Sequence, residues 1–218
     1  MESMVSSFRS LVAAASTSGA ASDAGGGGGG DGGGRGYVTA DFCASNRLLG
    51  AVFKGLGPAF EFAFSDFLKK VEMLDKVAVQ FPDLRSMLDH DVAGGTTKTK
   101  DGPTRNLKGV HHGLAFVSTL FDLMLGERSD GVEGKPPALK ACAEEAYAKE
   151  LAPFHNFVVR TAVAGAMLLV PHREQFLKDF GETEDSFRAH AEALPGLTRS
   201  VVADLEALYA SKGVPIDW

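Results

Sequence analysis

The residues from Thr104 to Gly126 read TRNLKGVHHGLAFVSTLFDLMLG and carry the clearest structural signal in the chain. Apolar side chains recur there at alternating three- and four-residue intervals, at Leu107, Val110, Leu114, Val117, Phe121 and Met124. This spacing is typical of an amphipathic α-helix that buries one face. The stretch therefore predicts one long helix in the protein core.

The sequence on either side of this helix is also helical in pattern. No segment of useful length from Tyr37 onward alternates with period two, so strands are not expected. Proline opens two further segments, at Pro58 and at Pro82, where it suits a first helical turn. Other helical segments lie near 137–150, 152–170, 172–180 and 197–211. Residues 37–218 are thus predicted to form one all-α domain of about eight helices.

The first 36 residues differ in composition from the rest of the chain. They hold 11 of the 26 glycines, several serines and few large apolar side chains. Such a segment buries too little surface to offset its conformational entropy, so residues 1–36 are predicted to be a disordered Gly/Ser-rich tail. The opening residues lack the basic start of a secretory signal, and a weak organelle transit peptide is the alternative reading.

Composition excludes several classes of protein. The chain has 218 residues, 44% of them hydrophobic, and 22 basic against 28 acidic side chains give a net charge of -6. That balance argues against a nucleic-acid partner, which favours a basic surface. The longest apolar run, 162–170, is well short of the roughly 20 residues that cross a bilayer. With only two cysteines, a reducing compartment and hence a cytoplasmic protein are expected.

Three groups of polar residues are candidates for a binding site. Asp66 and Lys70 stand four apart, on one helix face beside apolar side chains, where an ordinary surface pair is the alternative. Arg105, Lys108 and His112 share a face of the long helix and suit an anionic group, unless they form a solvated basic face. The third candidate is His155, for which the alternative is a core histidine whose hydrogen bonds are satisfied within the protein. No metal-ligand spacing and no nucleophile motif is present, so neither a cofactor nor enzyme activity is expected.

Four motifs in order resemble the glycolipid transfer protein superfamily. They are Ser65-Asp66 with Lys70-Val71, Thr104 to Leu107 leading into His111 to Leu114, Ala152 to His155, and the closing Ile216-Asp217-Trp218. The resemblance covers about residues 40–218 and is strongest to the plant accelerated-cell-death type, which transfers ceramide-1-phosphate. It implies a two-layer helical sandwich of about eight helices that encloses an apolar lipid pocket.

The resemblance also implies roles for single residues. Asp66 would bind the sphingosine amide, Lys70 the headgroup, His155 the acyl-amide oxygen and Arg105 the phosphate. Phe157 would touch the membrane, and Lys108 and His112 would be accessory headgroup contacts. The implied function is transfer of a sphingolipid such as ceramide-1-phosphate by a cytosolic protein that touches membranes only transiently. The alternative is a lipid-gated sensor of the same fold that does not transfer lipid efficiently.

One position departs from the family pattern. Four residues after Arg105, ceramide-1-phosphate binders have an arginine and glycolipid binders a tryptophan, whereas this chain has Gly109. Either another group occupies the space at Gly109, or a phosphate ligand has simply been lost. The second account is favoured, because Lys70 and Arg105 both remain. It predicts that Gly109→Arg tightens ceramide-1-phosphate binding.

Overall fold

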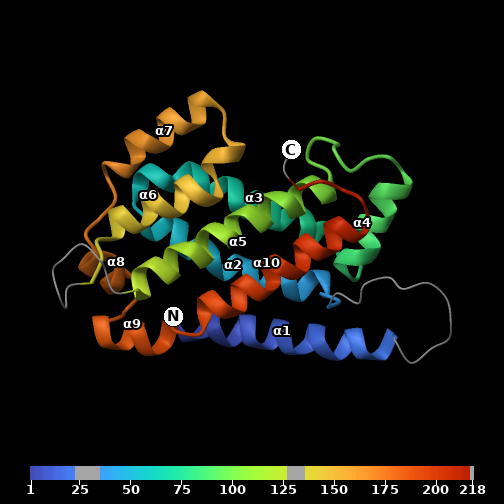
Figure 1. Ribbon diagram of the computed structural model, residues 1–218, viewed down its shortest axis with the longest axis horizontal. Coiled ribbons are helices and arrows are strands. Elements are labelled where there is room, and N and C mark those ends of the chain that lie inside the picture. The colour runs from blue at the N-terminus through green and yellow to red at the C-terminus, as the bar shows by residue number, and fades with distance from the viewer. Residues whose placement is uncertain (23–34, 127–135, 217–218) are drawn as a thin grey trace.

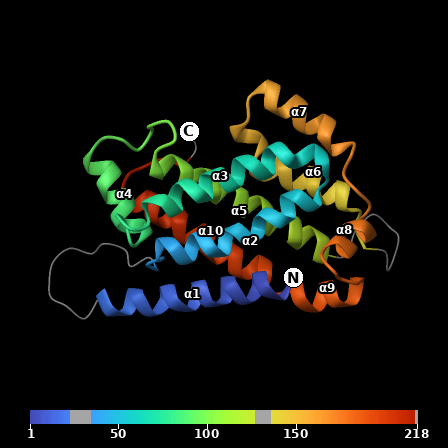
Figure 2. The same ribbon diagram turned by 180° about the vertical axis from the view of Figure 1, so that it is seen from behind.

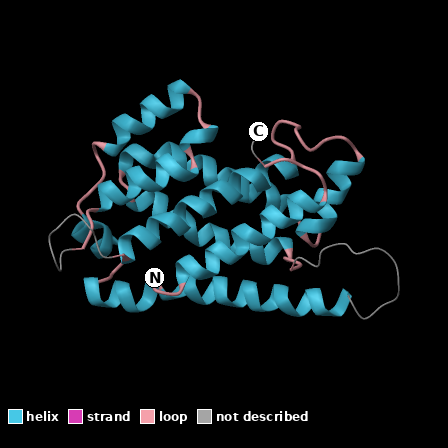
Figure 3. Cartoon of the chain, viewed as in Figure 1, coloured by secondary structure: helices cyan, strands magenta, loops and turns pink. Residues whose placement is uncertain are grey.

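The computed structural model describes residues 1–22, 35–126 and 136–216, and within these ranges every regular element is a helix (Figure 3). Extended pairing among them is limited to an isolated bridge between Val38 and Asp83. The all-α prediction is confirmed. The α-helices are α1 (Glu2–Ser22), α2 (Thr39–Gly55), α3 (Glu61–Val77), α4 (Leu84–Ala93), α5 (Pro103–Leu125), α6 (Leu139–Glu150), α7 (Phe157–Met167), α8 (Arg173–Asp179), α9 (Glu184–Ala191) and α10 (Leu194–Ser211), with short 3-10 turns η1 (Pro58–Phe60) and η2 (Ala152–Phe154).

The helices form two layers, as the family resemblance implied. In one layer α6, α5 and α10 lie side by side, with α5 in contact with both neighbours (Figure 1). In the other layer α2 and α3 pack against each other, and both contact α5 (Figure 2). Helix α1 runs along one edge and contacts α2 and α10, while α7 lies at the opposite edge.

The central helix α5 is fixed at its start by neighbouring helices. Pro103 occupies its first turn, where the missing amide hydrogen costs nothing. The buried Asp91 carboxylate of α4 accepts hydrogen bonds from the Thr104 backbone N–H at 3.0 Å and from its hydroxyl at 2.6 Å. From α10, the Tyr209 hydroxyl donates to the Thr104 carbonyl at 2.6 Å. These bonds fix the position of the first turns of α5, which carry the basic residues.

The prediction of a disordered tail is wrong for residues 2–22. They form α1, whose inner face is buried at Met4, Val5, Phe8, Leu11 and Ala15. Those positions follow helical spacing, and the apolar stripe packs against α2 and α10. The hydroxyls of Ser7 and Ser45 are also 2.8 Å apart. Averaging composition over 36 residues hid this short stripe behind the glycine run, and residues 23–34 lie outside the described residues.

Three smaller differences from the predicted helices have local causes. The described residues hold ten α-helices instead of about eight, because α1 and α9 were not predicted. Thr183 and Ser186 start α9 through a reciprocal capping box. The predicted segment 152–170 is broken at His155, where Asn156 caps α7 through its side-chain oxygen, 3.0 Å from the Val159 backbone nitrogen. Helix α10 begins at Leu194, three residues earlier than predicted.

Candidate functional site

Asp66 and Lys70 lie on the outer part of α3 and form an ion pair. The Asp66 side chain is 68% exposed, whereas that of Lys70 is 26% exposed. The carboxylate therefore keeps lone pairs open to solvent, although one oxygen faces the ammonium group. Their predicted proximity on one helix face is observed, and the unequal exposure distinguishes the pair from two fully solvated charges.

Lys70 lies directly against Gly109 of α5. A Cβ atom added to Gly109 would be 2.4 Å from the Lys70 Cδ and 2.5 Å from its Cε, well inside contact distance. The account of Gly109 as a simply lost ligand is therefore wrong, since the side chain of Lys70 fills the space. An arginine at this position would begin inside the volume that Lys70 occupies. The expected gain in affinity from Gly109→Arg no longer follows.

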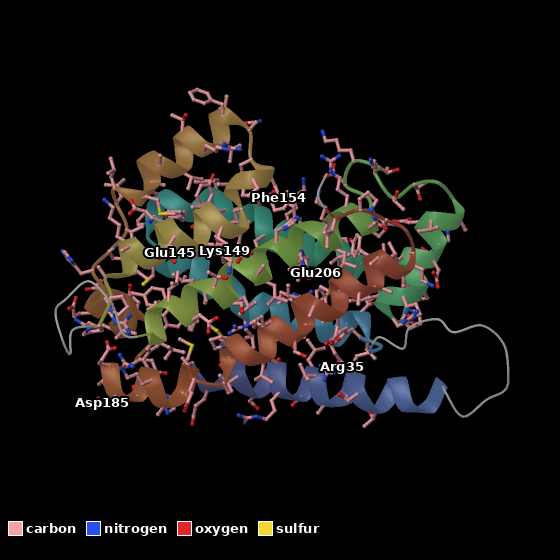
Figure 4. The ribbon with its side chains drawn as sticks, in the orientation of Figure 1. Arg35, Glu145, Lys149, Phe154, Asp185 and Glu206 are labelled. Atoms are coloured by element: carbon pink, nitrogen blue, oxygen red, sulfur yellow. The ribbon has the colours of Figure 1, made fainter. Side chains whose placement is uncertain are left out.

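Lys108 and His112 are buried together beneath Phe154, which lies where the chain turns from α6 toward α7 (Figure 4). The ring centroids of His112 and Phe154 are 3.9 Å apart, and the Lys108 ammonium lies 5.8 Å from the Phe154 centroid. Burial, together with nearby His111 and Lys108, lowers the pKa of His112 to about 3. His112 is thus an uncharged residue at neutral pH and supplies no cation.

His155 lies between η2 and α7, and its ring is held by α6. The Tyr147 hydroxyl is 3.1 Å from the His155 Nδ1, and the Arg160 Nε donates to the His155 carbonyl at 2.9 Å. Partial burial lowers the pKa of His155. The negative charge of Asp66 raises this pKa, and the positive charges of Arg160 and Lys70 lower it further. Asp66, Lys70 and His155 therefore share one electrostatic neighbourhood, although α3 and η2 are far apart in sequence.

Arg105 and Phe157 lie at two different parts of this region. Arg105 is exposed, one helical turn before Gly109 on α5, so the two residues lie on nearly the same side of that helix. Phe157 is the first residue of α7 and its side chain is 82% exposed.

The fold agrees with comparison to known proteins. Residues 37–182 match the sequence profile of the glycolipid transfer protein family. The chain belongs to the glycolipid transfer protein family. The match ends before α9 and α10, and begins after α1.

Individual family members extend the match over most of the chain. The accelerated cell death 11 homolog protein of Arabidopsis thaliana is 32% identical over 178 residues, which is 82% of this chain and 75% of the relative. The human ceramide-1-phosphate transfer protein is 25% identical over 171 residues, covering 72% of this chain and 77% of the relative. A crystal structure of a point mutant of Arabidopsis accelerated cell death 11, complexed with C12 ceramide-1-phosphate, has a TM-score of 0.80 and 26% identity, covering 97% and 98% of the two chains.

Two residues of the site were missed from the sequence. Phe154 covers Lys108 and His112, and Tyr147 contacts the His155 ring. Phe154 directly precedes the candidate residue His155, within the motif from Ala152 to His155. Tyr147 is eight residues from His155 across a helix break, so helical spacing gave no signal for it. The last two residues of the closing motif, 217–218, lie outside the described residues.

The neutral state of His112 predicts that acid destabilises the protein. Below its ordinary pKa of about 6.5, His112 is protonated in the unfolded chain but stays neutral in the folded one down to about pH 3. Stability from this residue is therefore present above pH 6.5 and is lost as pH falls, by up to about 1.4 kcal/mol per pH unit. We expect His112→Gln to flatten the decline in urea-unfolding free energy between pH 7 and pH 4.5. The exposed His172, replaced in the same way, is the control, and equal slopes in wild type and His112→Gln would contradict the assignment.

Proposed function

We propose that this protein transfers a ceramide-based lipid, ceramide-1-phosphate, between membranes. The observation that carries the proposal is the grouping of an exposed carboxylate, an ammonium and a neutral imidazole at Asp66, Lys70 and His155. These groups match the hydrogen-bonding needs of an amide beside an anionic headgroup. The relatives, among them the human ceramide-1-phosphate transfer protein and the Arabidopsis protein in complex with C12 ceramide-1-phosphate, favour the same lipid.

Recognition of the ceramide amide uses Asp66 and His155. A secondary amide has one N–H donor and one carbonyl acceptor, so it needs one acceptor and one donor from the protein. The Asp66 carboxylate accepts from the amide N–H. The Tyr147 hydroxyl lies 3.1 Å from the His155 Nδ1, and in the proposed arrangement it donates its proton to that nitrogen. The imidazole proton then lies on Nε2, where it donates to the amide carbonyl.

The phosphate is bound mainly by Lys70 and Arg105. Lys70 lies next to Asp66, and Arg105 is exposed one turn before Gly109. Charge-assisted hydrogen bonds from such cations are stronger than neutral ones. Lys108 is an accessory cation that is shielded by Phe154, while His112 acts as a neutral packing residue.

The hydrocarbon chains enter between the two layers. Phe53 lies there with its ring centroid 5.0 Å from Phe67 and 5.5 Å from Phe116, so aromatic side chains fill this space. Uptake requires that these rings move apart. Each methylene group shielded from water contributes about 0.8 kcal/mol, and transfer breaks no covalent bond.

Helix α7 is the proposed membrane contact. Its outer surface exposes Phe157, Val158, Leu168 and Leu169, the last two immediately after its final turn. Among the described residues no helix is both long and apolar enough to cross a bilayer. Contact is therefore proposed to be peripheral and transient, with the protein otherwise in the cytosol.

We expect Phe157→Ser to slow lipid transfer about tenfold or more, because burying a phenylalanine side chain in the interface contributes about 1.5 to 3 kcal/mol. Vesicle flotation and transfer between labelled vesicles measure the effect. The control is Val79→Ser, because Val79 is 97% exposed but lies just after α3, at the end away from η1 and α7. Unchanged vesicle binding by Phe157→Ser would contradict a membrane role for this end of α7.

Transfer assays with a panel of headgroups test the proposed function. Vesicles carrying fluorescent ceramide-1-phosphate, ceramide or glucosylceramide are mixed with acceptor vesicles and the full chain. Rapid transfer of ceramide-1-phosphate above the other two lipids is expected. Saturable binding without transfer would support a lipid sensor instead, and transfer of glucosylceramide alone would reject the phosphate assignment.

A further inference from the structure

Gly109 is a glycine in the middle of a long helix, where glycine normally weakens the structure. Its backbone does not adopt the left-handed conformation that would call for glycine. The reason lies in packing, because the nearest atoms to its missing Cβ are the Cδ and Cε of Lys70, at 2.4 and 2.5 Å. Gly109 therefore provides room for one particular side chain.

The path of Lys70 across α5 determines where its charge lies. The aliphatic part of the side chain rests on the Gly109 backbone, and the ammonium pairs with Asp66. Any side chain at position 109 would displace the Cδ and Cε atoms and move the ammonium group away from this place. Because the far end of a lysine side chain is flexible, displacing it would move the charge of Lys70 at little cost in folding stability.

We propose that Gly109 is a specificity-determining residue for the lipid headgroup, because it lets Lys70 cross α5 and hold its ammonium beside Asp66. Position 109 then carries no charge of its own, and the positive charge at this place comes from Lys70 of α3. This inference rests on the proposed function, since it assigns the means by which the phosphate is distinguished from a bare ceramide hydroxyl.

A second glycine, Gly113, lies one turn later and allows the role of Gly109 to be told apart from a role in helix packing alone. A Cβ at Gly113 would lie 2.6 Å from two ring carbons of Phe67, which is buried. Displacing a buried aromatic ring costs more than displacing the flexible end of a lysine side chain. Gly113→Ala should therefore lower thermal stability and weaken the binding of every lipid to the same extent. Gly109→Ala should instead change headgroup preference with little loss of stability.

The experiment is a double-mutant cycle in the full chain with wild type, Gly109→Ala, Lys70→Ala and the double variant. Binding of short-chain fluorescent ceramide-1-phosphate and of ceramide is measured for each. We expect Gly109→Ala to weaken ceramide-1-phosphate binding about tenfold or more, the range for one charge-assisted hydrogen bond, and to leave ceramide binding nearly unchanged. In the Lys70→Ala background the same substitution should have no further effect. Gly165→Ala is the matched control, since nothing lies within 4 Å of a Cβ there.

The outcomes distinguish the inference from the function on which it rests. Wild-type binding of ceramide-1-phosphate, combined with an unchanged preference in Gly109→Ala, overturns only the role of Gly109. The role of Gly109 is also overturned if Gly109→Ala weakens ceramide-1-phosphate binding as much in the Lys70→Ala background as it does in wild type. A wild-type protein that binds neither lipid overturns the proposed function and this inference with it. A crystal structure of Gly109→Ala gives a readout without lipid, because the Lys70–Asp66 ion pair should be broken there.

Discussion

Asp66→Val is expected to lower sphingolipid transfer about tenfold to a hundredfold while leaving the helical fold and its melting temperature nearly unchanged. Removing the carboxylate takes away a charged hydrogen-bond acceptor for the amide, which is worth about 1.5 to 3 kcal/mol. The cost to stability is small because the Asp66 side chain is 68% exposed and its ion pair is with Lys70 on the same helix. Transfer between vesicles and thermal unfolding followed by circular dichroism measure the two effects separately.

The same helix offers a matched control for this substitution. Asp75 also lies on α3 and forms an ion pair, with its carboxylate 2.6 Å from Arg47, but away from His155 and Gly109. Asp75→Val removes an equivalent surface charge pair and should leave transfer intact. Wild-type transfer by Asp66→Val would return Asp66 and Lys70 to the ordinary surface pair that helical spacing alone permits.

The parts of the fold that follow from helical period could be predicted from the sequence. The stripe from Leu107 to Met124 is buried along its length in α5, as its spacing requires. Asp66 and Lys70 meet because four residues make about one turn, a local rule that needs no knowledge of tertiary structure. The resemblance then supplied the two-layer arrangement, which periodicity alone does not determine.

The contacts between helices could not be predicted in the same way. Which side chain fills the space at Gly109 depends on how α3 approaches α5, and Lys70 is 39 positions earlier in the chain. The burial of His112 beneath Phe154 likewise depends on the turn after α6, so a basic helix face in the sequence contains a neutral residue in the structure. Side-chain identity fixes what a residue can do, but tertiary packing fixes its charge and its neighbours.

Helix α1 shows how an averaged composition conceals a local pattern. Met4, Phe8, Leu11 and Ala15 recur at the intervals of three and four that identified α5, yet the nearby glycine run dominated the count. The structure therefore reverses the expectation that this segment is not needed for folding. A disordered tail would be dispensable for folding, whereas a helix with a buried face is part of the core.

Removing residues 1–22 is expected to destabilise the domain severely, because the faces of α2 and α10 that α1 covers would be exposed to water. Single substitutions test whether the buried face of α1 is responsible for this loss of stability. Phe8 is fully buried, so Phe8→Ala should cost about 3 to 5 kcal/mol and lower the melting temperature by roughly 6 to 20 °C for a chain of this size. The neighbouring Arg9 is exposed, and Arg9→Ala should stay within about 0.5 kcal/mol of wild type. If the truncated chain and Phe8→Ala both melt like wild type, α1 does not belong to the core and the buried stripe is not a source of stability.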